Sequence, residues 1–246
     1  MTADQMPDLH YTDPALAAVY DTDSGWSADR DFYLALAGPP PIRILDLGCG
    51  TGLLCGAYAA LGHVVIGVDP APAMLNVART KPHGAAITWV QSTAQDFRSP
   101  DRFDLIIMTG HAFQVFLSDV DIQATFATMR QHLAPCGRIV FESRNPGVDW
   151  AKLWNTDAAY MVNGQRVQET RRVTSATGNF IAFDTCYTID GITRVSHSEL
   201  LFLSAPEITE RLILAGLQVN HLLGDWTGGR FDPDFSQEMI FIAGVQ

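Results

Sequence analysis

Apolar runs alternate with amphipathic stretches of helical period between residues 42 and 143 of this 246-residue chain. The runs are apolar at nearly every position, which is typical of parallel strands that helices cover on both faces. The pattern therefore predicts an α/β fold with a mainly parallel sheet. The predicted strands are 42–47, 63–69, 86–91, 103–110 and 136–143, and the predicted helices are 51–62, 71–81 and 118–134.

The pattern changes after residue 146, where polar and apolar residues alternate in three runs. The turn formers Gly178-Asn179 and Asp190-Gly191 separate these runs, which predicts an antiparallel meander. We assign residues 150–204 to an insertion inside a domain spanning 41–246, because a meander alone has too thin a core to fold by itself. A helix at 205–216 and strands at 217–226 and 238–246 are expected to complete the chain. Residues 1–40 are predicted to form an N-terminal helical segment.

Charge and cysteine content narrow the function classes. The formal net charge is −11 and the basic residues are scattered, which disfavours nucleic acid and anionic membrane surfaces as partners. No apolar stretch is long enough to span a bilayer, and the acidic N-terminus is unlike a signal peptide. The four cysteines have neither Cys-x-x-Cys nor zinc-ligand spacing, so we predict reduced thiols, no metal and a cytoplasmic location.

The stretch "ILDLGCGTG" places three glycines between a predicted strand and a predicted helix. Such a turn lets a ligand approach the main chain and the N-terminus of the helix. A dinucleotide fingerprint would need glycine at position 53, where Leu53 stands, and no phosphate-loop motif occurs. Asp46, two residues before the first glycine, suits an ammonium or sulfonium group better than a pyrophosphate.

A second acid, Asp69, ends the next predicted strand in "VIGVDPAPAML". A carboxylate at that position can accept hydrogen bonds from both hydroxyls of a ribose. This feature fits a nicotinamide dinucleotide equally well, and an N-cap of the following helix is a competing interpretation.

Four stretches in order, "ILDLGCGTG", "GVDPAPAML", "STAQDF" and "FDLIIMTG", resemble successive motifs of the class I S-adenosylmethionine-dependent methyltransferases. The resemblance covers about residues 42–145, and "GRIVFESRNP" and "EMIFIAGVQ" are similar to the fifth and seventh strands of that family. It implies a Rossmann-like, seven-stranded sheet with an antiparallel last strand. It also implies S-adenosyl-L-methionine as cofactor and methyl transfer to O or N of a small molecule by in-line displacement.

The resemblance further implies a cofactor site. The glycine loop would line the methionine part, Asp46 would lie near its amino group, and Asp69 would bind the ribose. Met74 and the pair Asp96 and Phe97 would contact the adenine, although Met74 can also be plain core and Asp96 a turn residue. A lid that includes Tyr20 would cover the cofactor. The complete predicted set is Tyr20, Asp46, Gly48, Cys49, Gly50, Gly52, Asp69, Pro70, Met74, Asp96, Phe97 and Thr109.

The acceptor would lie beyond the fourth strand, where His111 is the candidate general base. A hydrogen-bonded loop histidine that shapes the site is the competing interpretation. Phe113 and Gln114 are predicted acceptor contacts in the same loop, and Trp154 and Tyr160 are predicted contacts from the insertion. The insertion can instead form a dimer interface, so the protein is expected to be a monomer or a homodimer.

Two other functions fit parts of the pattern. The chain can be a non-catalytic module that binds S-adenosylmethionine or its demethylated product, since the cofactor motifs alone do not require an acceptor pocket. It can also be an NAD-dependent oxidoreductase, against which Leu53 and Asp46 both count.

Overall fold

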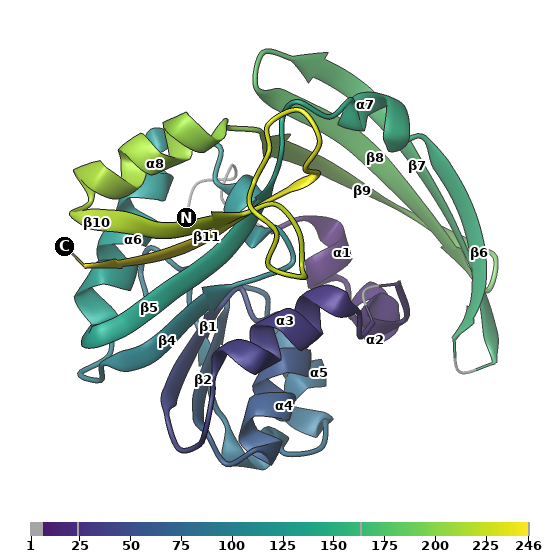
Figure 1. The fold of residues 1–246 in the computed structure, drawn as a ribbon. Coiled ribbons are helices and arrows are strands. Elements are labelled where there is room, and N and C mark those ends of the chain that lie inside the picture. The colour runs from purple at the N-terminus through teal and green to yellow at the C-terminus, as the bar shows by residue number, and fades with distance from the viewer. Residues whose placement is uncertain (1–6, 24, 163, 246) are drawn as a thin grey trace.

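The computed structural model describes residues 7–23, 25–162 and 164–245. Residues 1–6 of the predicted N-terminal segment lie outside the described residues. The strands form two separate sheets, one of seven strands and one of four. Figure 1 shows the four-stranded sheet standing beside the seven-stranded one, with the first two helices between them.

The seven-stranded sheet has the order β10-β11-β5-β4-β1-β2-β3. Strand β11 runs antiparallel to both of its neighbours, β5 and β10, whereas the β3-β2-β1-β4-β5 part is parallel. This confirms the predicted mainly parallel sheet with an antiparallel last strand. Its strands are β1 (Arg43–Leu47), β2 (Val64–Asp69), β3 (Thr88–Gln91), β4 (Phe103–Met108), β5 (Leu133–Arg144), β10 (Leu217–Leu223) and β11 (Glu238–Val245).

Helices cover both faces of this sheet, which explains the continuous apolar runs. Ile44 of β1 faces the core that includes α3 and α4, and its neighbour Leu45 faces the core that includes α6 and α8. Burial on both faces leaves few positions along these strands where a polar side chain reaches water. The helices here are α3 (Ala28–Leu36), α4 (Leu53–Ala60), α5 (Pro72–Thr80), α6 (Asp119–His132) and α8 (Ala205–Leu214), with 3-10 turns η2 (Gly84–Ala86) and η3 (Ala112–Val115).

The insertion forms the four-stranded antiparallel sheet, in the order β6-β7-β8-β9. The turns at Gly178 and at Asp190-Gly191 have positive φ angles, as the turn residues predicted. The prediction did not include β6, a largely exposed edge strand. The elements are α7 (Trp150–Leu153), β6 (Thr156–Val162), β7 (Gln165–Thr177), β8 (Phe180–Ile189) and β9 (Ile192–Leu201).

The N-terminal segment bridges the two sheets through α1 (Leu9–Thr12) and α2 (Pro14–Asp23). The Ser198 hydroxyl of β9 donates to the Asp8 carboxylate at 2.6 Å, and Arg194 of the same strand donates to Asp13 at 2.9 Å. Leu16 and Val19 of α2 also pack on apolar residues of the insertion. Ala17 of the same helix packs on α5, which covers the seven-stranded sheet. The segment therefore contacts both the insertion and the carboxyl edge of the parallel sheet.

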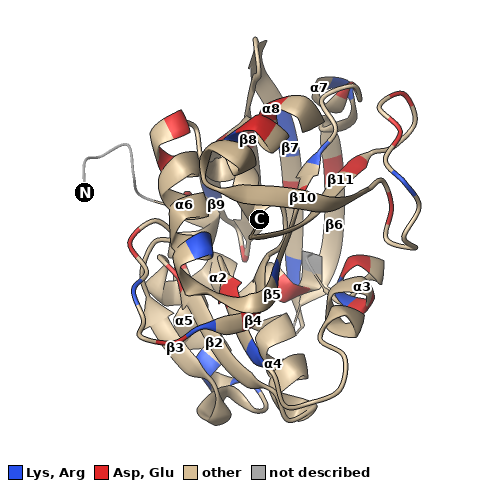
Figure 2. Cartoon of the chain, turned by 60° about the vertical axis from the view of Figure 1, so that its left-hand side comes forward, with Lys and Arg blue, Asp and Glu red and all other residues tan. Residues whose placement is uncertain are grey.

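Charged residues are dispersed along the fold (Figure 2), in keeping with the scattered basic residues of the sequence. Within the described ranges, no helix is both long and apolar enough to cross a membrane.

Candidate active site

The glycine loop between β1 and α4 adopts a backbone that favours glycine at three positions. Gly48, Gly50 and Gly52 have φ angles of +78°, +53° and +72°. A side chain at Gly52 would meet the Trp89 ring 2.4 Å away, whereas one at Gly50 would enter open space. Gly52 is thus required for packing, and Gly50 leaves room beside the main chain.

Asp46 lies beneath this loop and is only 2% exposed. Its Oδ2 accepts a hydrogen bond from the Cys55 thiol at 3.2 Å, whereas Oδ1 is buried with no partner among the described residues. Burial is the main cause that raises the pKa of Asp46 to about 7. An unpartnered carboxylate oxygen at this depth is the feature that a cationic ligand group would satisfy.

Asp69 ends β2 and faces the same loop. Its two oxygens accept from the Gly50 and Ala71 main-chain N–H groups, both at 2.8 Å. Burial raises the pKa of this carboxyl. The N-cap of α5 is Ala71, so Asp69 is not the N-cap, and its bond to Ala71 is a local turn contact two residues along the chain. The bond to Gly50 fixes the shape of the glycine loop. Pro70 follows directly between Asp69 and Ala71.

The N-terminal helices lie against this part of the site. Met74 of α5 is fully buried in a cluster with Ala17, and Tyr11 and Tyr20 pack against that cluster. Asp21 of α2 accepts a hydrogen bond from the Thr51 hydroxyl of the glycine loop. Tyr20 therefore packs against the cluster that contains the predicted adenine contact Met74.

The predicted adenine contacts after β3 have other partners. The exposed Asp96 accepts from the Thr93 hydroxyl at 2.9 Å, and the Phe97 main-chain N–H donates to the Thr93 carbonyl at 3.1 Å. Phe97 packs in the core beside His132. Ser92 lies nearer to the site, because its N–H donates to the Asp69 carbonyl at 3.3 Å. The sequence analysis did not single out Ser92, which lies four residues before Asp96.

His111 lies just past the end of β4, in a left-handed conformation with φ of +60°. Its main-chain N–H donates to Oε1 of Glu142 at 2.7 Å, and its ring Nε2 lies 2.9 Å from Oε2 of Glu238. The next residue, Ala112, lies 3.1 Å from the position that a Cβ on Gly48 would occupy. The His111 loop therefore lies against the glycine loop, with Thr109 at its start.

The two acids that contact His111, Glu142 and Glu238, were not predicted from the sequence. Glu142 of β5 is 1% exposed and also accepts a hydrogen bond from the Tyr33 hydroxyl. Burial raises the pKa of Glu142, while the adjacent His111 opposes this shift. The partners are 109 and 127 residues apart in sequence, so no local motif could join Tyr33 to Glu142 or His111 to Glu238.

The two predicted acceptor contacts in the His111 loop are buried. Phe113 packs between Phe126 and Phe141, with ring centroids 5.6 and 5.0 Å away. Gln114 has no exposed surface; its amide donates to the Leu201 carbonyl at 3.2 Å and its oxygen accepts from Arg144 at 3.0 Å. Core packing accounts for Phe113, and Gln114 positions Arg144.

The insertion residues Trp154 and Tyr160 lie apart from each other. Trp154 packs with Phe183, and the guanidinium carbon of Arg144 lies 4.9 Å from its ring centroid. Tyr160 belongs to a cluster near α2, and its hydroxyl donates to Glu169 at 3.2 Å. Trp154 is therefore linked to the end of β5, and Tyr160 to the other end of the insertion.

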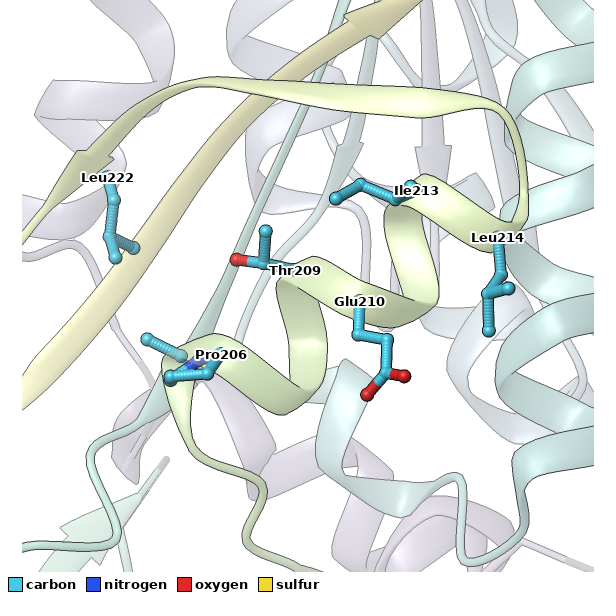
Figure 3. A pocket seen from close by; sticks show the side chains of 7 residues that line it. Pro206, Thr209, Glu210, Ile213, Leu214 and Leu222 are labelled. Carbon is cyan, nitrogen blue, oxygen red and sulfur yellow. The ribbon is translucent and has the colours of Figure 1, made fainter.

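A pocket of about 650 Å³ lies away from these residues, along α8 (Figure 3). Ala205, Pro206, Thr209, Glu210, Ile213, Leu214 and Leu222 line it. It contains none of the predicted site residues and one charged side chain, so it offers neither the carboxylates nor the histidine that the site requires.

A family model described as a methyltransferase domain matches residues 44–137, the segment that contains the glycine loop, Asp69 and His111. Curated relatives include ubiquinone biosynthesis O-methyltransferases from Cereibacter sphaeroides and Bradyrhizobium diazoefficiens, each 32% identical, over 59% and 51% of this chain. The matched segments cover 62% and 47% of those relatives, so the chain spans about half to three-fifths of their length.

Solved structures match nearly the whole fold. The CcbJ methyltransferase from Streptomyces caelestis has a TM-score of 0.77 at 18% identity, covering 96% of this chain and 98% of its own. DesVI from Streptomyces venezuelae has a TM-score of 0.76 at 21% identity, covering 94% and 98%. CalS10, an amino pentose methyltransferase from Micromonospora echinaspora bound to S-adenosylmethionine, has a TM-score of 0.69 at 23% identity, covering 92% and 95%.

These structural matches, at identities below 25%, establish the fold. Together with the sheet order and the glycine loop, the matched model shows that residues 44–137 carry a methyltransferase domain, within the fold of the S-adenosylmethionine-dependent methyltransferases.

Proposed function

We propose that the protein transfers a methyl group from S-adenosyl-L-methionine to an oxygen or nitrogen atom of a small molecule. The observation that carries this proposal is the meeting of the glycine loop with two buried carboxylates, one of which keeps an unpartnered oxygen. A pyrophosphate would place negative charge above Asp46, which disfavours the dinucleotide alternative. A cationic ligand would instead favour the charged form of Asp46, whose pKa is raised to about 7.

The residues around the loop fit this cofactor. Asp46 would compensate the positive charge of the methionine part, and the main chain at Gly50 would approach it without a side chain in the way. Asp69 would accept from the ribose, since each of its oxygens has a second lone pair beyond the bonds to Gly50 and Ala71. Met74 and Tyr20 would cover the adenine. The bound cofactor supplies an electrophilic methyl group.

His111 is the proposed general base for a hydroxyl acceptor. Its Nε2 is engaged by Glu238, which favours the tautomer with the proton on Nε2 and leaves Nδ1 to take a proton. Within the described part of the chain, no hydrogen bond engages Nδ1. A neutral amine acceptor would need positioning more than a base, and positioning alone can supply about 7–11 kcal/mol in favourable cases.

The acceptor, the assembly and the location are proposals of the same kind. The names of the O-methyltransferase relatives support an oxygen acceptor. We expect the insertion at 150–204 to contribute to the acceptor site and residues 1–40 to act as a lid over the cofactor. A monomer or homodimer in the cytoplasm, without a nucleic-acid partner, agrees with the acidic, scattered charge and the four free cysteines.

Calorimetric titration of the purified protein with S-adenosylmethionine and S-adenosylhomocysteine tests the cofactor. We expect both to bind, and Asp69→Ala to weaken binding at least tenfold. Transfer of a labelled methyl group to a panel of small phenols, hydroxy acids and amines then tests catalysis. Binding without transfer to any acceptor would favour a non-catalytic module, and failure to bind either compound would refute the proposal.

A further inference from the structure

Two arginines lie on one pair of aromatic rings beside the proposed base. Trp154 and Phe183 pack against each other with ring centroids 5.0 Å apart. The guanidinium carbon of Arg144 lies 4.9 Å from the Trp154 ring, and that of Arg171 lies 5.4 Å from the Phe183 ring. One cation comes from the carboxyl end of the parallel sheet and the other from the insertion.

Arg144 is poorly paired for a guanidinium of low exposure. Its side chain makes one hydrogen bond in the described part of the chain, from Nη1 to Gln114, although it carries five N–H donors. No carboxylate of the described residues lies within 4.0 Å of it. Two acids, Glu238 and Glu142, act on its charge, but Glu238 contacts His111, and Glu142 accepts from Tyr33 and His111.

Arg171 is also incompletely satisfied. Its Nη2 contacts Glu169 at 3.3 Å, but its Nε is buried with no partner among the described residues. Burial lowers the pKa of Arg144 to about 10; the charges of Glu238 and Glu142 oppose this shift, and the charge of Arg171 adds to it. Two like charges with spare donors are stabilised when an anion binds to both.

The position of this pair links it to the proposed reaction. Arg144 stands directly opposite Glu238 in the β5–β11 pairing, and Glu238 holds the ring of His111. A small molecule anchored at Arg144 would therefore have its other end near the base. Trp154 and Phe183 are each 8% exposed, so these rings hold the two guanidiniums in place beside the site.

We propose that Arg144 and Arg171 form a specificity site for an oxyanion, a carboxylate or a phosphate ester, carried by the methyl acceptor. This inference rests on the proposed methyltransferase function. It differs from a purely structural role, in which Arg144 would only brace Gln114 against the tryptophan. Only 16 of the 246 residues are Lys or Arg, and two of them contact this one pair of buried aromatic rings.

Probe binding tests the site without knowledge of the acceptor. The protein saturated with S-adenosylhomocysteine is titrated with benzoate, phenyl phosphate and benzamide at constant ionic strength, by calorimetry or by NMR. We expect one of the two anions to bind at least tenfold more tightly than the neutral benzamide. Which anion binds more tightly distinguishes a carboxylate site from a phosphate site.

Three variants assign the binding to residues. Arg144→Gln and Arg171→Gln should each weaken anion binding at least tenfold while leaving the affinity for S-adenosylhomocysteine and the melting temperature close to wild type. Arg172→Gln is the matched control, because Arg172 follows Arg171 on β7 but lies exposed and pairs with Asp157. Equal binding of anions and benzamide, or anion binding that survives in both variants, would overturn the proposal. If S-adenosylhomocysteine does not bind, the proposed function fails, and the anion titration of the unloaded protein still decides this inference.

Discussion

The ring Nε2 of His111 lies 2.9 Å from Oε2 of Glu238, which joins the loop after β4 to the first residue of the last strand. Both side chains are largely enclosed, with 19% and 17% of their surfaces exposed. Such a carboxylate fixes the orientation and the tautomer of a histidine that acts as a base.

We expect Glu238→Gln to lower kcat at least about tenfold with little change in KM, because the variant leaves His111 present but less well oriented. Initial rates with an acceptor from the label-transfer panel measure this effect. Glu210→Gln, in the pocket along α8, is the control and should retain wild-type rates. A wild-type kcat in Glu238→Gln would show that His111 does not need this partner.

Asp46 should show opposite effects on stability and on binding. Its buried carboxyl has a pKa of about 7, against 3.8 for the ordinary group. The folded state thus binds the proton more tightly, so this group costs stability above pH 7, and the cost disappears as the pH falls toward 4. Asp46→Asn should raise the free energy of unfolding by about 2–4 kcal/mol at pH 8 and leave it nearly unchanged at pH 4.

The same variant should weaken binding of S-adenosylmethionine at least tenfold, because it removes the negative charge beneath the glycine loop. Urea unfolding at the two pH values and calorimetric titration measure the two effects. A variant that is less stable at pH 8 and binds as wild type would contradict both parts of the prediction.

The fold was predictable where the burial of a strand determines the pattern of apolar residues in that strand. The parallel strands are buried on two faces, so their apolar runs are continuous, as in β4 with "FDLIIM". Strand β6, "TDAAYMV", was missed because it is an exposed edge with little apolar alternation, and its extended conformation depends on pairing with β7. Tertiary pairing overrode a weak local preference there.

The site was predictable only in its local parts. The glycine loop and Asp69 lie within one β-α-β unit, so spacing along the chain was sufficient to predict that they lie together, as the hydrogen bond from Gly50 to Asp69 shows. Spacing along the chain could not identify Glu238 or Arg144, because the two residues are brought together by the pairing of β11 with β5. Gln114 shows the converse: it occupies a predicted acceptor position, yet the fold buries it beneath Arg144.

Alanine variants of two glycines with similar backbone conformations distinguish an effect on ligand binding from an effect on stability. Gly50 and Gly38 have φ angles of +53° and +67°, and a Cβ at either would meet no atom within 4 Å. Gly50→Ala and Gly38→Ala should each cost about 1–2 kcal/mol of stability through the left-handed backbone alone. Only Gly50→Ala should also weaken S-adenosylhomocysteine binding at least tenfold, because its methyl group would enter the space beside the loop. Equal affinity in the two variants would place the ligand elsewhere.

His10 makes the attachment of the N-terminal segment sensitive to acid. Its ring Nδ1 lies 2.8 Å from the Ser196 hydroxyl of β9. Burial, with a smaller effect of Arg171, lowers the pKa of His10 from 6.5 to about 4. Between pH 6.5 and pH 4, His10 is therefore protonated in the unfolded chain but neutral in the folded one. The free energy of unfolding falls as the pH drops through this range. We compare the free energy of unfolding at pH 7 with that at pH 4.5. The decrease should be about 1–3 kcal/mol larger for the wild type than for His10→Gln. His221→Gln, at an exposed position, should behave as wild type, and identical pH profiles for wild type and His10→Gln would refute this role.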